Sequence, residues 1–310
     1  MPAHRALITG VGGFSGRHLV ERLRREPRWQ IFGLDTRPEA NGDLDDYFGC
    51  DLTDAEAVAE VVRQAQPDVV FHLAGLIGPV PDEQMWNVNV GGFIALRDAL
   101  RRHAQATGHP IAVLTIGSAA EIGAVAATQL PVTEEAPCLP AGGYGRSKWE
   151  VTRLALAEPA AGPLRISVAR VFNLVGPGLS AELALGSFAR QIAEVVHGRA
   201  KAVRCGRLDA RRDYVDVRDA VEAYVRLAER GRGGEIYNVC AGRSYGMDDL
   251  LRTMIELSGV AAEVIVDAAR GGARHLPDIY GDRSKIASET GWAPRIPIRQ
   301  SLADLLARAI

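Results

Sequence analysis

The stretch TGVGGFSG, residues 9–16, decides the fold of this chain. It follows a short apolar run, Arg5 to Thr9, and leads into a helical pattern from Phe14 to Arg25. Gly10, Gly13 and Gly16 allow a sharp turn and a close approach to a pyrophosphate, which the amides of a helix N-terminus then hold. Strand, glycine turn and helix in this order predict a dinucleotide-binding unit.

The rest of the first half continues this alternation of strands and helices. Apolar runs at 30–34, 69–73, 111–116 and 165–172 predict strands, and helical patterns occupy 54–64, 83–106 and 144–156. Such alternation predicts the α/β class, with a doubly wound parallel sheet of the Rossmann type.

After Asn173 the regular alternation stops, and short elements lie between Gly- and Arg-rich loops. We therefore expect residues 1–172 to form a dinucleotide-binding domain and residues 173–310 to form mainly a smaller substrate-binding domain. A helix at 217–229 and a strand at 235–239 indicate that 213–241 returns to the first domain.

Composition excludes several classes of protein. The chain has 310 residues, is 47% hydrophobic and 24% charged, and carries a net charge of −2, which are values typical of a globular enzyme and not of a nucleic-acid binder. The four cysteines form no CxxC pair and the seven histidines show no ligand spacing, so no metal site is expected. No stretch of apolar residues is long enough to predict a membrane span. We expect a cytoplasmic protein.

The ends of the predicted strands supply candidate cofactor residues. Asp35 ends the second strand about twenty residues after the glycine turn, where an acidic group bonds the adenosine ribose and favours NAD(H). Arg37 is a nearby cation, which makes NADP(H) possible. The other candidates lie in the glycine turn and at the following strand ends: Phe14, Ser15, Asp51, Leu52, Leu73, Ala74 and Gly75.

Tyr144 and Lys148 are the candidate proton-transfer pair. Their i, i+4 spacing places both side chains on one face of a helix. Only three of the 36 basic residues are lysines. A lysine at position 148 therefore indicates that an ammonium group, and not a guanidinium group, is needed there. An ammonium beside a phenol is expected to lower the phenol pKa, and Ser118 could bond the oxygen that changes charge. Without these roles the pair would be a solvated helix face and Ser118 a loop cap.

At this point the chain resembles the extended short-chain dehydrogenase/reductase family, namely its nucleotide-sugar epimerases, dehydratases and ketoreductases. The resemblance covers nearly the whole chain and rests on TGVGGFSG, HLAG, NVNVGG, GSAAEIG, YGRSK, RVFNLVGPG, RRDYVDVRD and EIYNVCAG. It implies catalytic roles for Ser118, Tyr144 and Lys148, with Lys148 also bound to the nicotinamide ribose. It places Asn89 near the active site, and Asn173 and Arg212 on the nucleotide part of the substrate. The second half looks most like the GDP-6-deoxy-4-keto-mannose reductases.

Three departures from the family pattern bear on the reaction. Ile122 stands where the family usually has Tyr, so one wall of the site is altered. Ala120 stands where the dehydratases have a carboxylate, and Glu121, one residue further, should point elsewhere. This argues against a dehydratase. Arg270 and Arg274 are offset candidates for a phosphate contact.

The resulting prediction is NAD(P)H-dependent reduction of a nucleotide-linked 4-keto-6-deoxysugar. An NAD-retaining nucleotide-sugar 4-epimerase is the alternative, and a non-catalytic nucleotide sensor is disfavoured by the intact Ser, Tyr and Lys. The basic cluster Arg204, Arg207, Arg211 and Arg212 is either a diphosphate clamp, which we favour, or a solvated loop. The helices at 83–106 and 144–156 either pack across a homodimer axis or only cover the sheet.

Overall fold

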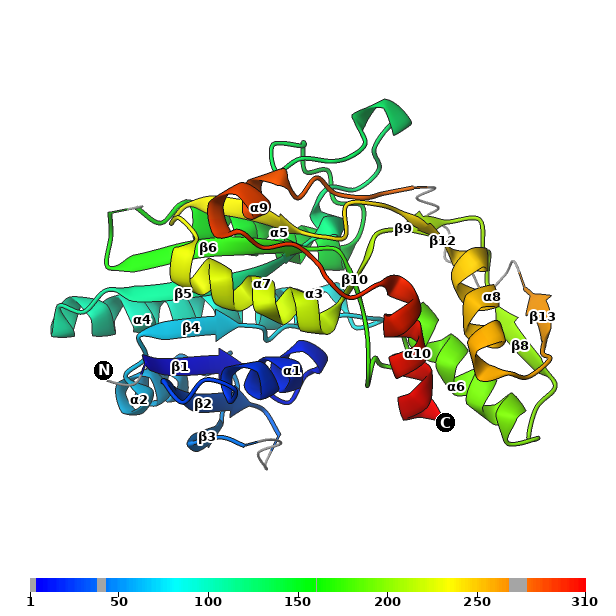
Figure 1. Cartoon of the computed structure of the whole chain (residues 1–310). Helices are drawn as coiled ribbons and strands as arrows, with labels where there is room; N and C mark the ends of the chain where they lie inside the picture. Colours follow the sequence, from blue (N-terminus) through cyan, green and yellow to red (C-terminus); the bar gives the residue numbers. More distant parts are fainter. Residues whose placement is uncertain (1–3, 38–42, 160, 268–277) are drawn as a thin grey trace.

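The computed structural model describes residues 4–37, 43–159, 161–267 and 278–310. Its centre is a seven-stranded parallel sheet in the order β11-β6-β5-β4-β1-β2-β3 (Figure 1). The strands are β1 (His4–Thr9), β2 (Trp29–Asp35), β3 (Asp46–Gly49), β4 (Val69–His72), β5 (Ile111–Ser118), β6 (Leu164–Val171) and β11 (Glu235–Val239). The predicted doubly wound parallel sheet is confirmed.

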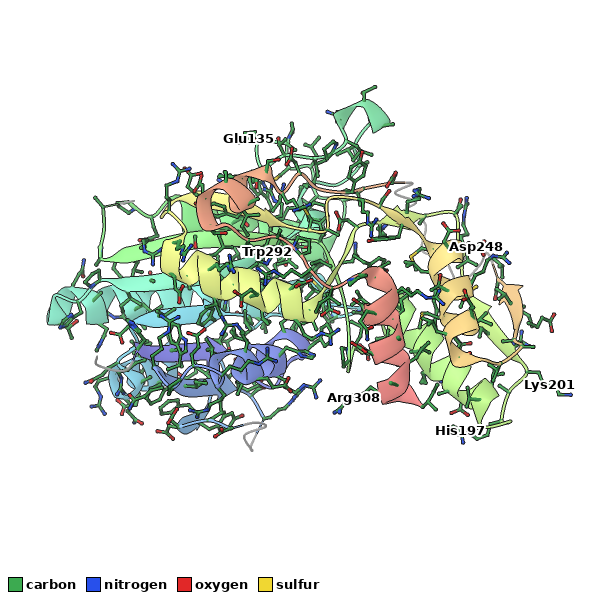
Figure 2. The ribbon with its side chains drawn as sticks, in the orientation of Figure 1. Glu135, His197, Lys201, Asp248, Trp292 and Arg308 are labelled. Atoms are coloured by element: carbon green, nitrogen blue, oxygen red, sulfur yellow. The ribbon has the colours of Figure 1, made fainter. Side chains whose placement is uncertain are left out.

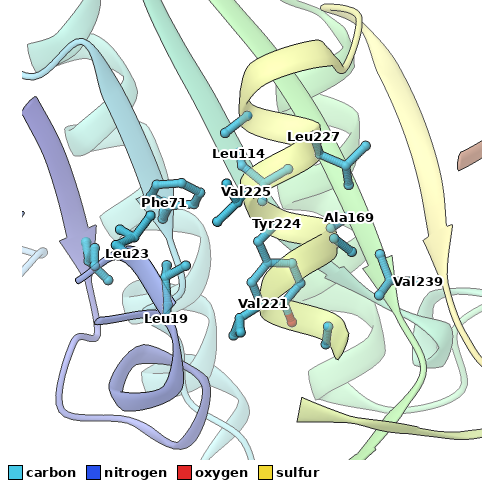
Figure 3. Close-up of a cluster of buried hydrophobic side chains, with 14 of the residues drawn as sticks. Leu19, Leu23, Phe71, Leu114, Ala169, Val221, Tyr224, Val225, Leu227 and Val239 are labelled. Carbon is cyan, nitrogen blue, oxygen red and sulfur yellow. The ribbon is translucent and has the colours of Figure 1, made fainter. Parts of the chain in front are cut away.

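Helices cover both faces of this sheet. One face carries α1 (Phe14–Leu23) and α7 (Val217–Arg230), and the other carries α2 (Ala55–Ala65), α4 (Gly92–Thr107) and α5 (Gly143–Leu156). Figure 3 shows Tyr224 and Leu227 of α7 among Phe71, Leu114 and Ala169 of the sheet. Because both faces are covered, the inner strands β4 and β6 are almost continuously buried.

The helical pattern at 83–106 is not one helix. It divides into α3 (Asp82–Trp86), a wide π-helical turn at Asn87–Gly91, and α4. Within this turn Asn89 is buried, and its amide bonds the backbone of Leu76 after β4. π-Helical turns are frequent at functional sites, and this one brings a polar side chain to the carboxyl end of the sheet.

A smaller unit lies beyond the carboxyl ends of the strands, on the right in Figure 1. Its core joins three helices to short strand pairs. Its elements are β7 (Asn173–Val175), α6 (Ala184–Val196), β8 (Ala202–Cys205), β9 (Arg211–Arg212), β10 (Tyr214–Asp216), β12 (Tyr245–Gly246), α8 (Met247–Ser258), β13 (Glu263–Val266) and α10 (Ile298–Ala309).

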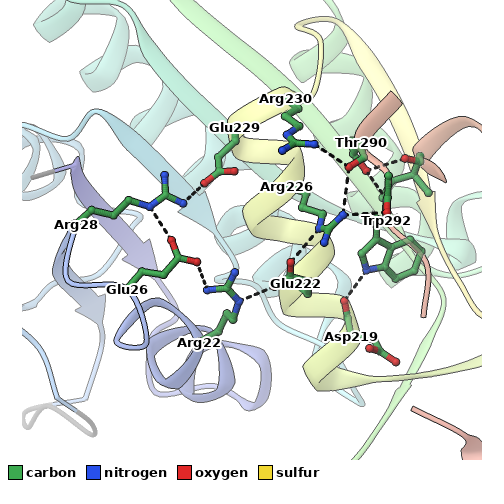
Figure 4. A network of polar contacts seen from close by, with 12 residues as sticks. Arg22, Glu26, Arg28, Asp219, Glu222, Arg226, Glu229, Arg230, Thr290 and Trp292 are labelled. Carbon is green, nitrogen blue, oxygen red and sulfur yellow. Dashed lines mark hydrogen bonds and ion pairs between the residues drawn. The ribbon is translucent and has the colours of Figure 1, made fainter. Parts of the chain in front are cut away.

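Helix α7 joins the two units. On one side Glu222 accepts a hydrogen bond of 2.5 Å from Arg22 of α1 (Figure 4). On the other side the Trp292 indole donates to the Asp219 carbonyl at 2.9 Å, and the Asp219 carboxylate accepts from the amide of Arg295. Along the chain, Trp292 stands between α9 (Ser284–Thr290) and α10, and it lies near the middle of the molecule (Figure 2).

The described part of the chain contains neither a membrane-spanning helix nor a cluster of metal ligands. No helix in these ranges is long and apolar enough to cross a membrane. No group of three or more His, Cys, Asp or Glu side chains among them is placed to hold a metal ion. The four cysteines are all free thiols.

Candidate active site

The glycine turn is built for a close backbone approach. Gly10 has φ +68°, and a Cβ there would lie 2.8 Å from the backbone N of Ala74. A Cβ on Gly16 would lie 2.5 Å from the carbonyl oxygen of Gly10. Helix α1 starts after Gly13 with no side chain capping its first amides and no acidic residue in its first turn. These residues fit a dinucleotide pyrophosphate, which such free amides would bind.

The carboxylate of Asp35 lies against the glycine turn. It accepts a hydrogen bond from the Gly12 amide at 3.0 Å. The Arg37 guanidinium folds over the same glycine and donates to the Gly12 carbonyl at 2.6 Å. An acceptor for a ribose hydroxyl and a cation for a phosphate thus lie side by side, which suits NAD(H) and also accommodates NADP(H).

The remaining cofactor candidates follow the next strand ends. The amides of Leu73 and Ala74 each bond Thr9, at 3.2 Å. A Cβ on Gly75 would lie 3.3 Å from Lys148 Nζ, so this loop adjoins the lysine. Asp51 caps the turn before α2, and its neighbour Leu52 is buried, while Phe14 and Ser15 are half-buried in the first turn of α1.

Ser118, Tyr144 and Lys148 converge at the end of β5. The Ser118 side chain lies close enough to the Tyr144 phenol to lower its pKa. Lys148 is 7% exposed and donates to the Ile116 carbonyl at 3.0 Å. Helix α5 holds the Tyr and Lys one turn apart, as the spacing predicted.

The expected effect of Lys148 on the Tyr144 pKa is wrong. Burial raises the pKa of Tyr144 to about 12, although the Ser118 side chain acts to lower it, and Lys148 is not among the groups that lower it. Burial also lowers the pKa of Lys148 to about 8. Tyr144 is therefore a protonated phenol at neutral pH, ready to donate its proton.

Two buried polar residues beside Lys148 escaped the sequence analysis. His72 pairs through Nδ1 with the Thr9 hydroxyl at 2.8 Å. Burial, with a smaller contribution from Lys148, lowers the pKa of His72 to about 3, so the imidazole is neutral. Ser147 accepts a hydrogen bond from the Asn89 amide at 3.0 Å. His72 belongs to the HLAG motif, which could have indicated it, whereas nothing in the sequence indicated Ser147.

Asn89 is occupied by protein partners. Its Oδ1 accepts from the Leu76 amide at 2.6 Å, and its Nδ2 donates to Leu76 and Ser147. It therefore fastens the loop after β4 to helix α5. The contact of Asn89 with substrate stays a prediction.

Glu121 points into the protein interior, as the sequence analysis expected. Its carboxylate accepts from the Ser118 amide at 2.7 Å, the Thr152 hydroxyl at 3.1 Å and the Arg170 Nε at 3.3 Å. Its neighbour Ile122 is also buried, in an apolar cluster with Phe172. The partners of Glu121 come from α5 and β6, far away in the sequence, and were not predicted.

The candidate substrate residues lie in two places. Asn173 begins β7 and donates to the Asp213 carbonyl at 3.1 Å, next to the half-buried Arg212. Arg207 is exposed after β8 and pairs with Asp209 at 2.5 Å. Arg270 and Arg274 lie outside the described residues.

Asp213 is a further residue that sequence reasoning missed. Its buried carboxylate accepts from the amides of Ala241 at 2.7 Å and Gly242 at 3.0 Å. Burial raises its pKa to about 6. It ties the segment that carries Arg212 to the loop after β11.

A glycine turn at the first strand, with Ser, Tyr and Lys at the carboxyl end of a parallel sheet, defines a short-chain dehydrogenase/reductase site. The comparisons agree with this class. Residues 6–240 match the NAD dependent epimerase/dehydratase family, and the chain belongs to that family.

Individual relatives narrow the resemblance. The chain is 31% identical to the GDP-6-deoxy-D-mannose reductase of Pseudomonas aeruginosa, over 97% of this chain and 96% of that protein. A solved structure of RMD from Pseudomonas aeruginosa, complexed with NADPH, superposes with a TM-score of 0.85 at 30% identity, covering 98% of each chain. The UDP-glucose 4-epimerase of Streptomyces lividans is 28% identical, over 93% of this chain and 91% of that protein.

Arg37 should govern the use of NADPH. Replacing Arg37 with Ala removes a cation that a 2′-phosphate can bond, so the Kd for NADPH should rise about tenfold while the Kd for NADH stays within about threefold. Titrations that follow nicotinamide fluorescence measure both constants. Arg63→Ala, on the exposed face of α2, is the control. An equal loss for both cofactors would contradict the assignment.

Proposed function

We propose that this protein reduces the keto group of a nucleotide-linked 4-keto-6-deoxysugar to a hydroxyl, with NADH or NADPH as reductant. The observation that carries the proposal is that α5 brings Tyr144 and Lys148 to the end of β5, which carries Ser118, beside the glycine turn. Reduction of a ketone requires an acid near the carbonyl oxygen. The 31% identity to a GDP-6-deoxy-D-mannose reductase supports the same substrate class.

In this mechanism the nicotinamide supplies the hydride that reaches the ketone carbon. Tyr144 donates its proton to the ketone oxygen as negative charge develops there. Ser118 donates a hydrogen bond to the same oxygen and orients it. The Lys148 ammonium, one helical turn after Tyr144, would bind the nicotinamide ribose.

Contacts remote from the reacting carbon would position the sugar. We assign Asn173 and Arg212 to the diphosphate or its ribose, with Arg207 as an outer contact once it leaves Asp209. Residues 1–172 together with 213–241 would bind the dinucleotide, and the other segments of 173–310 would bind mainly the substrate. The separate cores support this division, and Ile286 and Trp292 from the last segment also pack in the first core.

A 4-epimerase that retains NAD is the second candidate. The similarity to a UDP-glucose 4-epimerase favours it. An epimerase must first remove a proton from a sugar hydroxyl, and a phenol with a pKa of about 12 is a weak base for that step at neutral pH. Dehydration is disfavoured because Ala120 has no carboxylate and Glu121 is turned inward.

The reaction itself is the direct test. Incubation with NADH or NADPH and a GDP- or dTDP-linked 4-keto-6-deoxysugar should consume the reduced cofactor and form one deoxysugar nucleotide. Absorbance at 340 nm and chromatography of the product measure this. Protein purified and then denatured should release less than stoichiometric NAD. Interconversion of UDP- or GDP-hexoses without added cofactor, with no keto-sugar reduced, would establish the epimerase instead.

Tyr144→Phe should remove the proton donor and keep the ring. We expect kcat to fall by a factor on the order of 100 to 10,000, with the Kd for the cofactor nearly unchanged. Stopped-flow consumption of NADH and a fluorescence titration give the two values. Near-normal turnover would show that another group is the acid. Lys148→Arg should weaken both cofactor binding and rate, because the compact ammonium is lost.

We further propose that the protein is a cytoplasmic homodimer that pairs through α4 and α5. The long α4 and α5 lie on one outer face of the sheet, and the four cysteines are free thiols. Sedimentation velocity at micromolar concentration should give twice the 33.3 kDa chain mass. A species of one chain mass would contradict the dimer.

A further inference from the structure

Behind the catalytic serine lies a buried ion pair that the proposed mechanism does not use. The side chains of Glu121 and Arg170 are both 0% exposed. One carboxylate oxygen of Glu121 accepts from the Ser118 amide and from the Thr152 hydroxyl of α5. The other accepts from Arg170 of β6. A single carboxylate thus connects the end of β5, helix α5 and strand β6.

Thr152 stands one helical turn after Lys148 and two turns after Tyr144, on the same face of α5. The bond from Thr152 to Glu121 therefore fixes the helix that presents Tyr and Lys. The bond from Ser118 fixes the backbone of the third catalytic residue. Relative movement of Ser118 and α5 must break one of these bonds.

The strand leaves room for this carboxylate. A Cβ on Gly117 would lie 2.6 Å from Glu121 Oε1 and 3.3 Å from Thr152 Oγ1. Gly117 has no positive φ, so its backbone conformation does not demand glycine. The space for the carboxylate is the steric reason for a glycine at this position.

Glu121 also acts on charge. The ionisable groups around it are Arg170 from β6, Lys148 and Tyr144 from α5, and Cys138 from the loop before α5. Burial raises the pKa of Glu121 more than Arg170 and the two hydrogen-bond donors lower it, so the net shift is upward. Burial lowers the pKa of Lys148, and Glu121 opposes that effect. The other ionisable neighbour of Lys148, His72, is neutral.

We propose that Glu121 is the positioning residue of this site: it locks Ser118 to helix α5 and supplies the negative charge that keeps Lys148 an ammonium ion. The first part concerns hydrogen bonds and the second concerns charge, so separate variants distinguish them. Its effect on turnover rests on the proposed reduction, whereas its effect on Lys148 can be measured without any substrate.

Lysine-specific isotope labelling makes the charge measurable. The chain has only three lysines, at positions 148, 201 and 285, so a spectrum of protein with ¹³C-labelled lysine shows three Cε signals. Lys201 lies at the far end of the smaller unit (Figure 2), and Lys285 pairs with Glu235 at 2.8 Å. Lys201→Arg and Lys285→Arg assign the signals, and a pH titration then gives the midpoint of Lys148.

Glu121→Gln should lower the midpoint of Lys148 by about one pH unit, because the amide has no charge to oppose desolvation. Glu158→Gln is the matched control, since Glu158 is a buried carboxylate paired with Arg101 at the far end of α5. It should leave the midpoint within about 0.3 unit. An unchanged midpoint in folded Glu121→Gln would overturn the charge role.

Glu121→Gln leaves Arg170 buried without its counter-ion and can prevent folding. In that case the double variant Glu121→Gln/Arg170→Met, which removes both charges, is used instead. The Lys148 midpoint must still fall in this protein, because the negative charge that opposes desolvation of the lysine is gone. A midpoint equal to that of the parent protein would reject the proposal.

Variants of Thr152 test the hydrogen-bond role of Glu121 separately from its charge. Thr152→Val removes the hydroxyl donor and keeps the carboxylate, so kcat should fall about 3- to 10-fold, with KM for the sugar nucleotide and the Lys148 midpoint unchanged. Thr152→Ser should restore kcat, which a loss of packing alone does not explain. Equal rates for Val and Ser would reject the positioning role. If the parent protein reduces no keto-sugar, the proposed function fails while the lysine titration still decides the role of Glu121.

Discussion

The parallel pairing of β5 with β6 is the constraint on which the rest of this structure depends. Eight consecutive residues of each strand are in register, from Ile111 opposite Leu164 to Ser118 opposite Val171. The end of this ladder therefore sets the position of Ser118, and it places Arg170 beside Gly117 with the Glu121 carboxylate between the strands and α5. The chain leaves β6 only two residues before Asn173, so the same ladder also sets the start of the smaller unit.

Burial then determines the charge of the site. It raises the pKa of Tyr144 to about 12 and lowers those of Lys148 and His72 to about 8 and 3, so each group is shifted toward its neutral form. Developing negative charge on a substrate oxygen would thus meet the Tyr144 and Ser118 hydroxyls, and hydrogen bonds to a charged group are the stronger ones. The Glu121 carboxylate is the group that limits this neutralisation at Lys148.

Local patterns in the sequence were sufficient to predict the sheet, the glycine turn and the helix that carries Tyr144 and Lys148. Each of these depends on residues within a few positions of one another. The partners of Glu121 are different, because Thr152 and Arg170 lie 31 and 49 residues away. The prediction for the Tyr144 pKa failed for a related reason. The spacing of Tyr144 and Lys148 carries no information about how deeply the tertiary structure buries the phenol. The π-helical turn was missed because its apolar pattern continues that of the helices around it.

The return of the chain through α7 and β11 has a consequence for how such a protein can change. The smaller unit is built from two separate stretches of chain, because the stretch between them returns to the sheet: β11 pairs with the edge of β6, and α7 packs beside α1 on one face. A fragment ending at residue 172 would leave the part of that face under α7 bare and β6 as an open edge. The smaller unit therefore cannot be exchanged as one continuous segment without also replacing part of the sheet and its cover.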